Sequence, residues 1–575
     1  MVRTFDDNKL VIDMVHHNPA EKKFETEFLD PRKCFKYGYN GQVFKHISCA
    51  VSFEQYDEEI CPKGSQTRIW IDNLTTEIAD QISKAKQAGL QMFYHIDLFI
   101  LPTVLVQKYK DQICDEKGRI SINKSKTLEI HRALFSELFN RFDIDGLIIR
   151  MGETYTWESP FHTGNSPVNF ADQEQNKLKE IEAFAKTINF LREEICQRYN
   201  KILIIRTWDT KIDRFHANED YYLQVTDQVP SHSKLYFSIK HTKLDFYKPV
   251  DFNPCLCKGE HQQIIEVQCQ REYEGKGAFP NYVMREIIEG EYDSTKRKGL
   301  RDIIKDERIK GLYTWSRGGG FFGPYIKNEF WCDMHAWIIS KWFRMPEMDE
   351  EKIFYEYTQT AGFDGENSRL LRQICLLSSK AVLKGHYCSV AGSNVDLKYL
   401  LWTRDDRIGG FENLTQVFEE IVLTGNVDAA LTEKAAAVSM FRDIVSLSKK
   451  LKGPSEELTE FIRVSCLYGL HYFSIIYHGW RVMLLGYTGD NNRQYDIESI
   501  RNAIKCYDSA WQDFNKLTSN PLCATLYADV HWSWPGENKL GGDHNKVNFF
   551  EPGIGQSVNR YRHLARAASV KTAVV

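Results

Sequence analysis

The chain has 575 residues, of which 42% are hydrophobic and 26% charged, a composition that is typical of globular proteins and excludes a disordered or fibrous chain. Its 74 Lys and Arg residues nearly balance 78 Asp and Glu residues, which leaves a formal net charge of −4. A chain this close to neutral is not expected to work mainly by holding nucleic acid or a membrane surface. Aromatic residues make up 13% of the chain, and their flat faces suit both sugar rings and apolar cores.

From about residue 40 to 315, short β-branched or aromatic runs alternate with longer amphipathic stretches. One stretch is expected to begin at an Asn73 cap and to end at Gly89, and another, residues 172–199, carries a regular helical stripe. An eighth strand is expected within residues 10–40 or after Gly320. The seven runs that we predict as strands are residues 44–51, 91–97, 146–151, 202–208, 235–239, 264–268 and 311–315.

This alternation indicates a parallel sheet with helices on both faces. The number and spacing of the predicted strands favour a (β/α)8 barrel (a TIM barrel) that spans residues 1–345. No glycine-rich nucleotide motif opens any of the helices, so we expect no cofactor.

After about residue 350 the strand signals stop, and an all-α C-terminal domain is predicted over residues 346–575. The apolar run 464–480 contains two histidines and is interpreted as a buried bundle helix rather than a membrane span. The segment 464–485 is a candidate homodimer surface, and residues 531–536 (HWSWPG) are expected to form an ordered loop. The predicted helices are residues 351–361, 367–384, 411–423, 428–451, 456–486 and 495–517.

The 14 cysteines are scattered and form no CxxC pair, which favours free thiols over a zinc site or a disulfide framework. The N-terminus shows no secretory signal, so we expect a cytoplasmic protein, although a mature chain whose signal peptide has been removed would look the same.

Charged residues follow the predicted strands, where the catalytic groups of such barrels sit. Three successive strand ends combine a cation with a carboxylate: Arg150 with Glu153, Arg206 with Asp209, and Lys240 with Asp245. The three cations would bind a carboxylate or phosphate, and the acids Glu153, Asp245 and Glu272 would transfer protons. The alternative is that these residues form the ion pairs that commonly rim a barrel.

Other candidates are weaker. Residues 317–320 (RGGG) could bind phosphate at the end of a strand. His95 and Asp97 could hold a metal, but nothing completes a ligand set, and we expect no metal site. Trp208, Trp315 and Trp331 could stack on sugars or pack in the core.

Four segments resemble the α-glucuronidases of glycoside hydrolase family 67. They are FSIKHTKLDF at residues 237–246, IIEVQCQREYEG at 264–275, LIIRMGE at 147–153 and IIR at 204–206. The resemblance implies that Glu153 is the general acid and that Asp245, Glu272 or both act as base. It also implies that Arg150, Arg206 and Lys240 hold the uronic carboxylate. Two departures weaken the substrate assignment: the family's β-rich N-terminal domain has no counterpart here, and Arg150 stands where the family has Lys.

Together these features predict an inverting glycoside hydrolase that removes a terminal α-linked uronic acid, or a related acidic sugar, from an oligosaccharide. Two alternatives stay open. One is a carbohydrate-binding pseudoenzyme, and the other is a barrel enzyme that acts on a phosphorylated small molecule.

Overall fold

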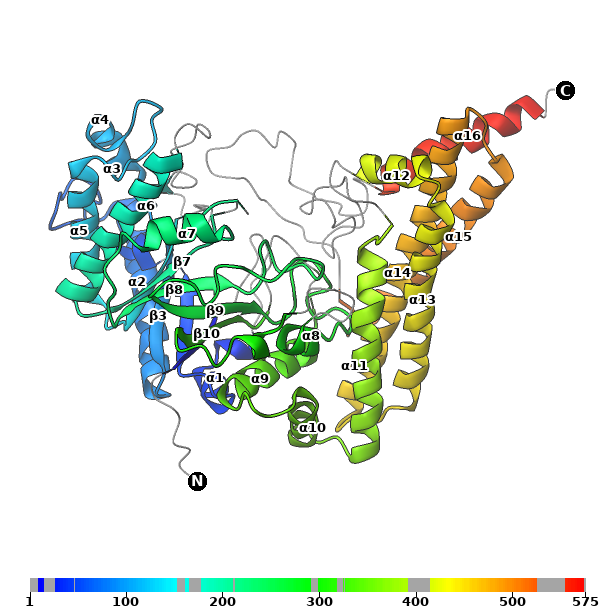
Figure 1. Ribbon diagram of the computed structural model, residues 1–575, viewed down its shortest axis with the longest axis horizontal. Helices are drawn as coiled ribbons and strands as arrows, with labels where there is room; N and C mark the ends of the chain where they lie inside the picture. Colours follow the sequence, from blue (N-terminus) through cyan, green and yellow to red (C-terminus); the bar gives the residue numbers. More distant parts are fainter. Residues whose placement is uncertain are drawn as a thin grey trace.

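The computed structural model describes residues 9–14, 26–45, 47–151, 161–164, 177–209, 213–290, 298–317, 324, 326–390, 414–524 and 554–572. A strand-and-helix barrel lies at one end of the molecule and a group of long helices lies at the other (Figure 1). The described chain therefore has the predicted arrangement of a barrel followed by a helical region.

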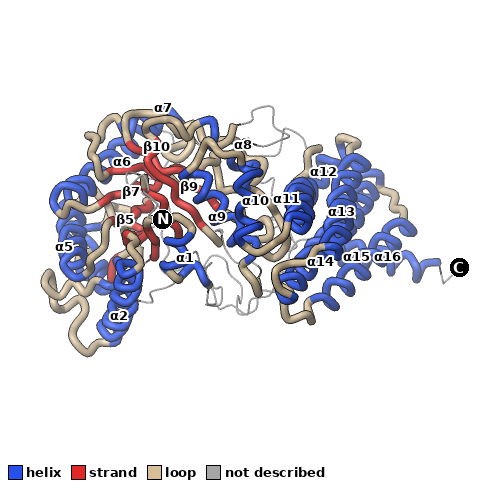
Figure 2. Tube along the Cα trace, turned by 90° about the horizontal axis from the view of Figure 1, so that it is seen from below, coloured by secondary structure: helices blue, strands red, loops and turns tan. Residues whose placement is uncertain are grey.

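Among the described residues, eight parallel strands close into a barrel in the order β1-β10-β9-β8-β7-β5-β3-β2. Figure 2 shows the strands gathered inside a ring of helices. The predicted (β/α)8 fold is confirmed. The strands are β1 (Leu10–Met14), β2 (Gly41–Lys45), β3 (Gln91–Asp97), β5 (Gly146–Arg150), β7 (Ile202–Arg206), β8 (Leu235–Lys240), β9 (Gln262–Gln268) and β10 (Ile309–Trp315). A small hairpin outside the barrel joins β4 (Leu101–Pro102) and β6 (His162–Thr163).

The eighth strand is β1, which lies within the predicted range of residues 10–40. The predicted strand 44–51 is wrong in its position: β2 ends at Lys45, and Ile47–Ala50 form a turn of 3-10 helix. All four residues of this turn are buried. A buried turn and a buried strand give similar short apolar runs, and periodicity alone does not separate them.

The helices of the barrel follow the strands. They are α1 (Pro31–Lys36), α2 (Gln66–Gln87), α3 (Thr103–Lys108), α4 (Lys110–Ile113), α5 (Ser125–Arg141), α6 (Lys177–Leu191), α7 (Glu219–Thr226), α8 (Met284–Glu289) and α9 (Phe330–Arg344). The predicted Asn73 cap is wrong, because α2 begins two turns earlier, where the Ser65 hydroxyl accepts a hydrogen bond from Arg68 N at 3.2 Å. Helix α6 continues as a π-helical turn, Arg192–Arg198, across most of the predicted stretch 172–199.

The helical region consists of α10 (Glu350–Thr360), α11 (Gly365–His386), α12 (Leu414–Leu423), α13 (Val427–Lys450), α14 (Glu456–Asn492), α15 (Ile497–Leu517) and α16 (Ile554–Thr572). All six predicted helices are present, and α16 was not predicted. The apolar run 464–480 lies inside α14, and among the described residues no helix is long and apolar enough to cross a membrane. Residues 531–536 lie outside the described residues.

The barrel closes where its first and last strands pair. Asp13 on β1 is fully buried there and accepts hydrogen bonds from the hydroxyls of Thr314 and Ser316, at 2.5 and 2.9 Å, and from Ser316 N at 3.1 Å. Burial raises the pKa of Asp13 from 3.8 to about 6, against these hydrogen bonds, which lower it. The closing seam therefore contains a carboxyl group that is neutral in mild acid.

This raised pKa predicts a pH dependence of stability. The folded state binds the proton more tightly, so the contribution of Asp13 is complete below about pH 4 and is lost as the pH rises through about 6. The full loss is about 3 kcal/mol. Asp13→Asn retains an acceptor oxygen, and its new amide can donate to Ser316, so we expect this variant to lack that loss in urea unfolding at pH 4.5 and 7.

A control of opposite sign is Asp496→Asn. The Ser499 amide lowers the pKa of Asp496 by donating to its carboxylate at the start of α15, so acidification removes the stability that this residue contributes. Equal pH profiles for the wild type and Asp13→Asn would contradict the prediction for Asp13.

Candidate active site

In a parallel barrel the carboxyl ends of all strands meet at one rim. The inward residues of the lower layers are apolar, including Ile12, Phe93, Ile148, Ile204 and Ile264. Because side chains alternate along a strand, the inward positions at the rim follow by register from these residues. They are Lys45, His95, Asp97, Arg150, Arg206, Ser238, Lys240, Glu266, Gln268 and Trp315. The rim thus has a polar layer on an apolar floor.

The cations of this layer are paired with carboxylates. The Arg150 guanidinium donates to both oxygens of Asp97, at 2.5 and 2.8 Å. The Arg206 guanidinium donates to both oxygens of Glu266, at 2.9 and 2.5 Å. The described partners of Arg150 and Arg206 are thus acids of other barrel strands, Asp97 on β3 and Glu266 on β9.

Lys240 pairs with Asp245 as predicted, with its Nζ 2.6 Å from Oδ1. Glu153 lies outside the described residues. Asp209 faces its own loop, where it accepts the Phe215 N–H at 3.1 Å. Sequence reasoning missed Glu266, although a charged residue between apolar Ile265 and Val267 in a buried strand is a signal for an inward ion pair.

The pairs differ in exposure. The side chains of Arg206 and Glu266 are only 2% and 1% exposed, whereas that of Asp245 is 26% exposed. Burial lowers the pKa of Arg206, but the adjacent Glu266 outweighs it, so the net pKa is raised and the guanidinium stays charged. Arg206 Nη1 is buried and has no hydrogen-bond partner among the described residues. Asp245 is therefore the accessible acid of these three pairs, and Arg206 retains an unused donor.

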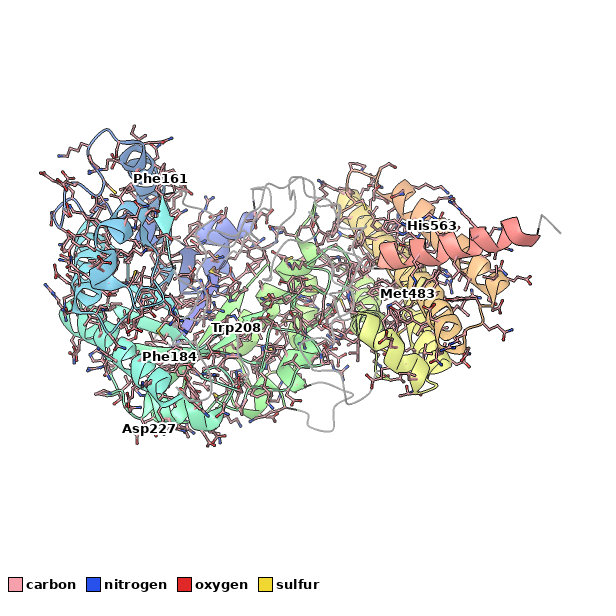
Figure 3. All side chains as sticks on the ribbon, turned by 90° about the horizontal axis from the view of Figure 1, so that it is seen from above. Phe161, Phe184, Trp208, Asp227, Met483 and His563 are labelled. Carbon is pink, nitrogen blue, oxygen red and sulfur yellow. The ribbon has the colours of Figure 1, made fainter. Side chains whose placement is uncertain are left out.

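Aromatic and neutral groups surround Lys240. Its Nζ lies 3.4 Å from the centre of the Trp208 ring and 5.0 Å from that of Phe246. Burial, with Lys240 next, lowers the pKa of His216 well below its usual value, and burial, Arg271 and Lys240 lower that of His241 to about 3. Both imidazoles are therefore neutral near pH 7. In Figure 3, Trp208 lies between Phe184 of an outer barrel helix and Met483 of the helical region.

Glu272 lies on a buried segment after β9. Every residue from Cys269 to Val283 is buried, which is unusual for a loop. Arg271, Tyr273 and Lys276 have positive φ values of 47°, 61° and 43°, a conformation that costs free energy in non-glycine residues. Such strain is held by the surrounding structure and is concentrated at functional sites.

Glu274 ties this segment to two others. Its Oε1 accepts the N–H of Lys248, three residues after Asp245, at 2.8 Å, and the hydroxyl of Tyr387 at 2.5 Å. Tyr387 directly follows α11, in the helical region. In addition, Glu272 N donates to Phe246 O at 3.3 Å. The loops that carry Asp245 and Glu272 are thus bound to each other and to the helical region.

The remaining candidates have structural partners. Asp97 is bound by Arg150, and among the described residues no group of three metal-binding side chains is found. Arg317 donates to Glu329 at 3.0 Å, and residues 318–320 lie outside the described residues. Trp331 is buried, and its indole N–H donates to Ser465 at 3.2 Å, so it packs between the barrel and α14 and is not available to a sugar.

No protein-family model and no curated protein matches the chain. Among solved structures, the chain is similar to an enzyme of glycoside hydrolase family 138 that targets pectin rhamnogalacturonan II. The match covers 97% of this chain and 67% of that chain, with 10% identity and a TM-score of 0.55. A second match is an O-GlcNAc hydrolase mutant of Thermobaculum terrenum. This match covers 89% of this chain and 94% of that chain, with 12% identity and a TM-score of only 0.38. At such identities the first similarity shows the fold, and the resemblance to family 67 stays a prediction.

The buried Arg206–Glu266 pair gives a prediction about stability. Glu266→Gln keeps the volume of the side chain but leaves the guanidinium without a buried counter-charge, which is expected to destabilise the protein by about 3 to 5 kcal/mol. Urea unfolding measures this loss. The matched control is Asp251→Asn in the exposed Lys243–Asp251 pair, whose side chains are 39% and 43% exposed. This change is expected to cost under about 1 kcal/mol, and losses of equal size would show that Glu266 does not neutralise Arg206.

Proposed function

We propose that the protein is a glycoside hydrolase that removes a terminal acidic sugar from an oligosaccharide. The observation that carries this proposal is the Lys240–Asp245 pair, in which an accessible carboxylate lies beside an ammonium that packs over the Trp208 ring. An accessible carboxylate can accept a proton from an attacking water. The fold shared with the family 138 enzyme, which acts on a polysaccharide, supports the same class of reaction.

In this proposal Asp245 is the base that accepts a proton from the attacking water. Glu272 is the second candidate base, and its backbone N–H donates to the carbonyl of Phe246, the residue that follows Asp245. Glu153 keeps the role of general acid that the resemblance to family 67 implies. Inversion requires the acid and base carboxyl groups to be about 6.5 to 9.5 Å apart, with room for water between them.

The acidic sugar is proposed from the cations. Lys240 Nζ has donors beyond the one given to Asp245, and Arg206 Nη1 is a buried donor without a partner among the described residues. A substrate carboxylate would accept a hydrogen bond from Lys240, whereas Arg206, whose side chain is 2% exposed and paired with Glu266, would act on it through its charge. Arg150 stands next to Arg206 in the register and adds positive charge, although Asp97 holds its side chain. Glucuronic acid, or a related uronic acid in α-linkage, fits this chemistry.

The base assignment predicts the behaviour of Asp245→Asn. The amide cannot accept the proton of water, so turnover should fall by about a hundredfold to ten-thousandfold, while binding of free glucuronic acid should change little. Proton NMR of the protein with short oligosaccharides that carry glucuronic acid measures both release and anomer. A β-anomer that appears first would establish an inverting α-uronidase. Unchanged turnover in the variant would exclude Asp245 as the base.

Recognition of the carboxylate predicts a difference between substrates. Lys240→Ala is expected to lower kcat/KM about a hundredfold for an aryl uronide, but much less for the neutral aryl glycoside with the same ring, because only the uronide loses a charge-assisted hydrogen bond. Any effect of the substitution on Asp245 lowers kcat/KM for both substrates alike. The ratio of the two losses therefore measures the contact between Lys240 and the substrate carboxylate. Equal losses on the two substrates would argue for a purely structural lysine.

A further inference from the structure

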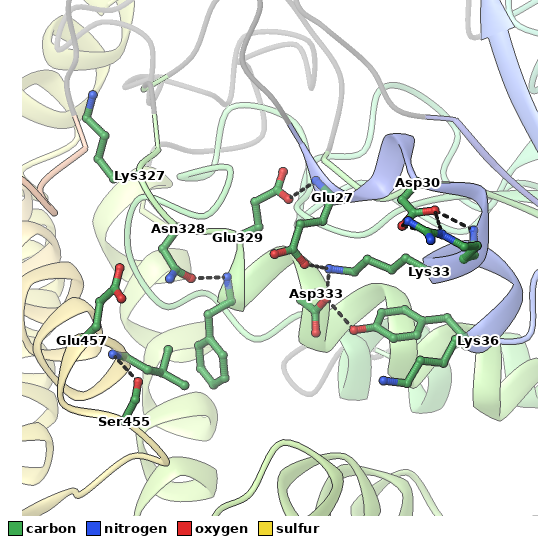
Figure 4. A pocket seen from close by; sticks show the side chains of 14 residues that line it. Glu27, Asp30, Lys33, Lys36, Lys327, Asn328, Glu329, Asp333, Ser455 and Glu457 are labelled. Atoms are coloured by element: carbon green, nitrogen blue, oxygen red, sulfur yellow. Dashed lines mark hydrogen bonds and ion pairs between the residues drawn. The ribbon is translucent and has the colours of Figure 1, made fainter. Parts of the chain in front are cut away.

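A cavity lies where the helical region meets the barrel (Figure 4). It has a volume of about 780 Å³, within the range of about 300 to 1,000 Å³ that is typical of small-molecule sites. Three segments line it: residues 27–37 around α1, residues 327–333 at the start of α9, and residues 455–458 at the start of α14. Helices α1 and α9 follow β1 and β10, so their first turns lie at the carboxyl end of the barrel, on the side of the candidate active site.

Hydrogen bonds and ion pairs hold the polar wall of this cavity together. Asp333 accepts hydrogen bonds from the hydroxyls of Tyr37 and Tyr357, at 2.6 and 3.0 Å, and its carboxylate lies 2.6 Å from Lys33 Nζ. Lys33 also reaches Glu27 at 2.7 Å, so that it bridges two carboxylates (Figure 4). The side chains of this wall therefore hold one another in place.

One side chain contacts both the lining of the cavity and the segment after β10. Glu329 lines the cavity, where one of its oxygens accepts the N–H of Glu27 at 3.1 Å. Its other oxygen accepts a hydrogen bond from Arg317, two residues after β10, at 3.0 Å. The cavity and the carboxyl end of β10 therefore lie on either side of Glu329.

The charges that line the cavity indicate the chemistry of its ligand. Five carboxylates and four cations line it, so it has no excess of positive charge for an anion, in contrast to the cations of the barrel mouth. The side chains of Lys36 and Lys327 are exposed and form no hydrogen bond or ion pair with another described residue. Interspersed donors and acceptors, with the rings of Tyr37 and Phe330, match hydroxyl groups, which both donate and accept.

We infer that this cavity binds neutral sugar residues of the oligosaccharide, on the leaving-group side of the bond that is cleaved. The inference rests on the proposed function. The mouth takes the terminal acidic sugar, and the cavity takes the uncharged part that continues from it. Lys36 and Lys327, which lie on different segments of the cavity lining, donate hydrogen bonds to the hydroxyl groups of these neutral sugars.

The test is binding of neutral xylo-, cello- and malto-tetraose, measured by saturation-transfer NMR and titration on the full chain. At least one of them is expected to bind, and the double variant Lys36→Ala/Lys327→Ala should weaken its Kd about tenfold. The matched control, Lys84→Ala/Lys516→Ala, removes two exposed lysines elsewhere and should leave the Kd unchanged. If none of the three binds, or if both double variants bind equally well, the inference is overturned.

A kinetic arm separates this inference from the proposed function. For an oligosaccharide with a neutral extension, the Lys36→Ala/Lys327→Ala variant should raise KM about tenfold, and for an aryl uronide without one it should change neither KM nor kcat. Equal KM changes on both substrates would overturn the inference. Loss of hydrolysis altogether, with tetraose binding still dependent on the two lysines, would overturn the proposed function alone.

Discussion

The organisation of this protein depends on charge neutralisation inside a closed barrel. Closure brings the inward side chains of eight strands together at one rim, where Arg150, Arg206 and Lys240 have little contact with water. A buried cation is tolerated only beside an acid with good hydrogen-bond geometry. The Arg206–Glu266 pair spans from β7 to β9 across β8, so it also opposes any slip in the register of these strands, since a shift by one residue would turn its charges outward.

The buried segment after β9 shows how the two parts of the molecule depend on each other. Its left-handed residues Arg271, Tyr273 and Lys276 are costly, and the contacts that offset this cost come partly from outside the barrel. Glu274 accepts a hydrogen bond from the hydroxyl of Tyr387. Lys248, in the loop of Asp245, donates to Glu286 of α8 and to Ser379 of α11, each at 2.5 Å. The helical region therefore shapes the loops that carry Asp245 and Glu272.

Much of the fold could be predicted from the sequence, because buried parallel strands and amphipathic helices leave strong local patterns. The prediction failed where the pattern is shared by two structures, as for the buried turn Ile47–Ala50, or where a cap lies outside the clearest stripe, as for Ser65. In the site, Lys240 and Asp245 lie five residues apart and were found. Glu266 was missed because its partner Arg206 is 60 residues away, and such pairing is set by barrel closure.

The seam between β1 and β10 also has a consequence for biosynthesis. The first strand has no partner on one side until the last strand has been made, since Leu10 pairs with Gly311 and Asp13 contacts Thr314 across 301 residues of sequence. At about 5 to 20 residues per second, a ribosome needs roughly 15 to 60 seconds to span that distance. During this interval β1 presents an unpaired apolar edge, and closure of a contact so distant in sequence is slow. The order of synthesis thus leaves one edge of β1 unpaired until β10 has been made.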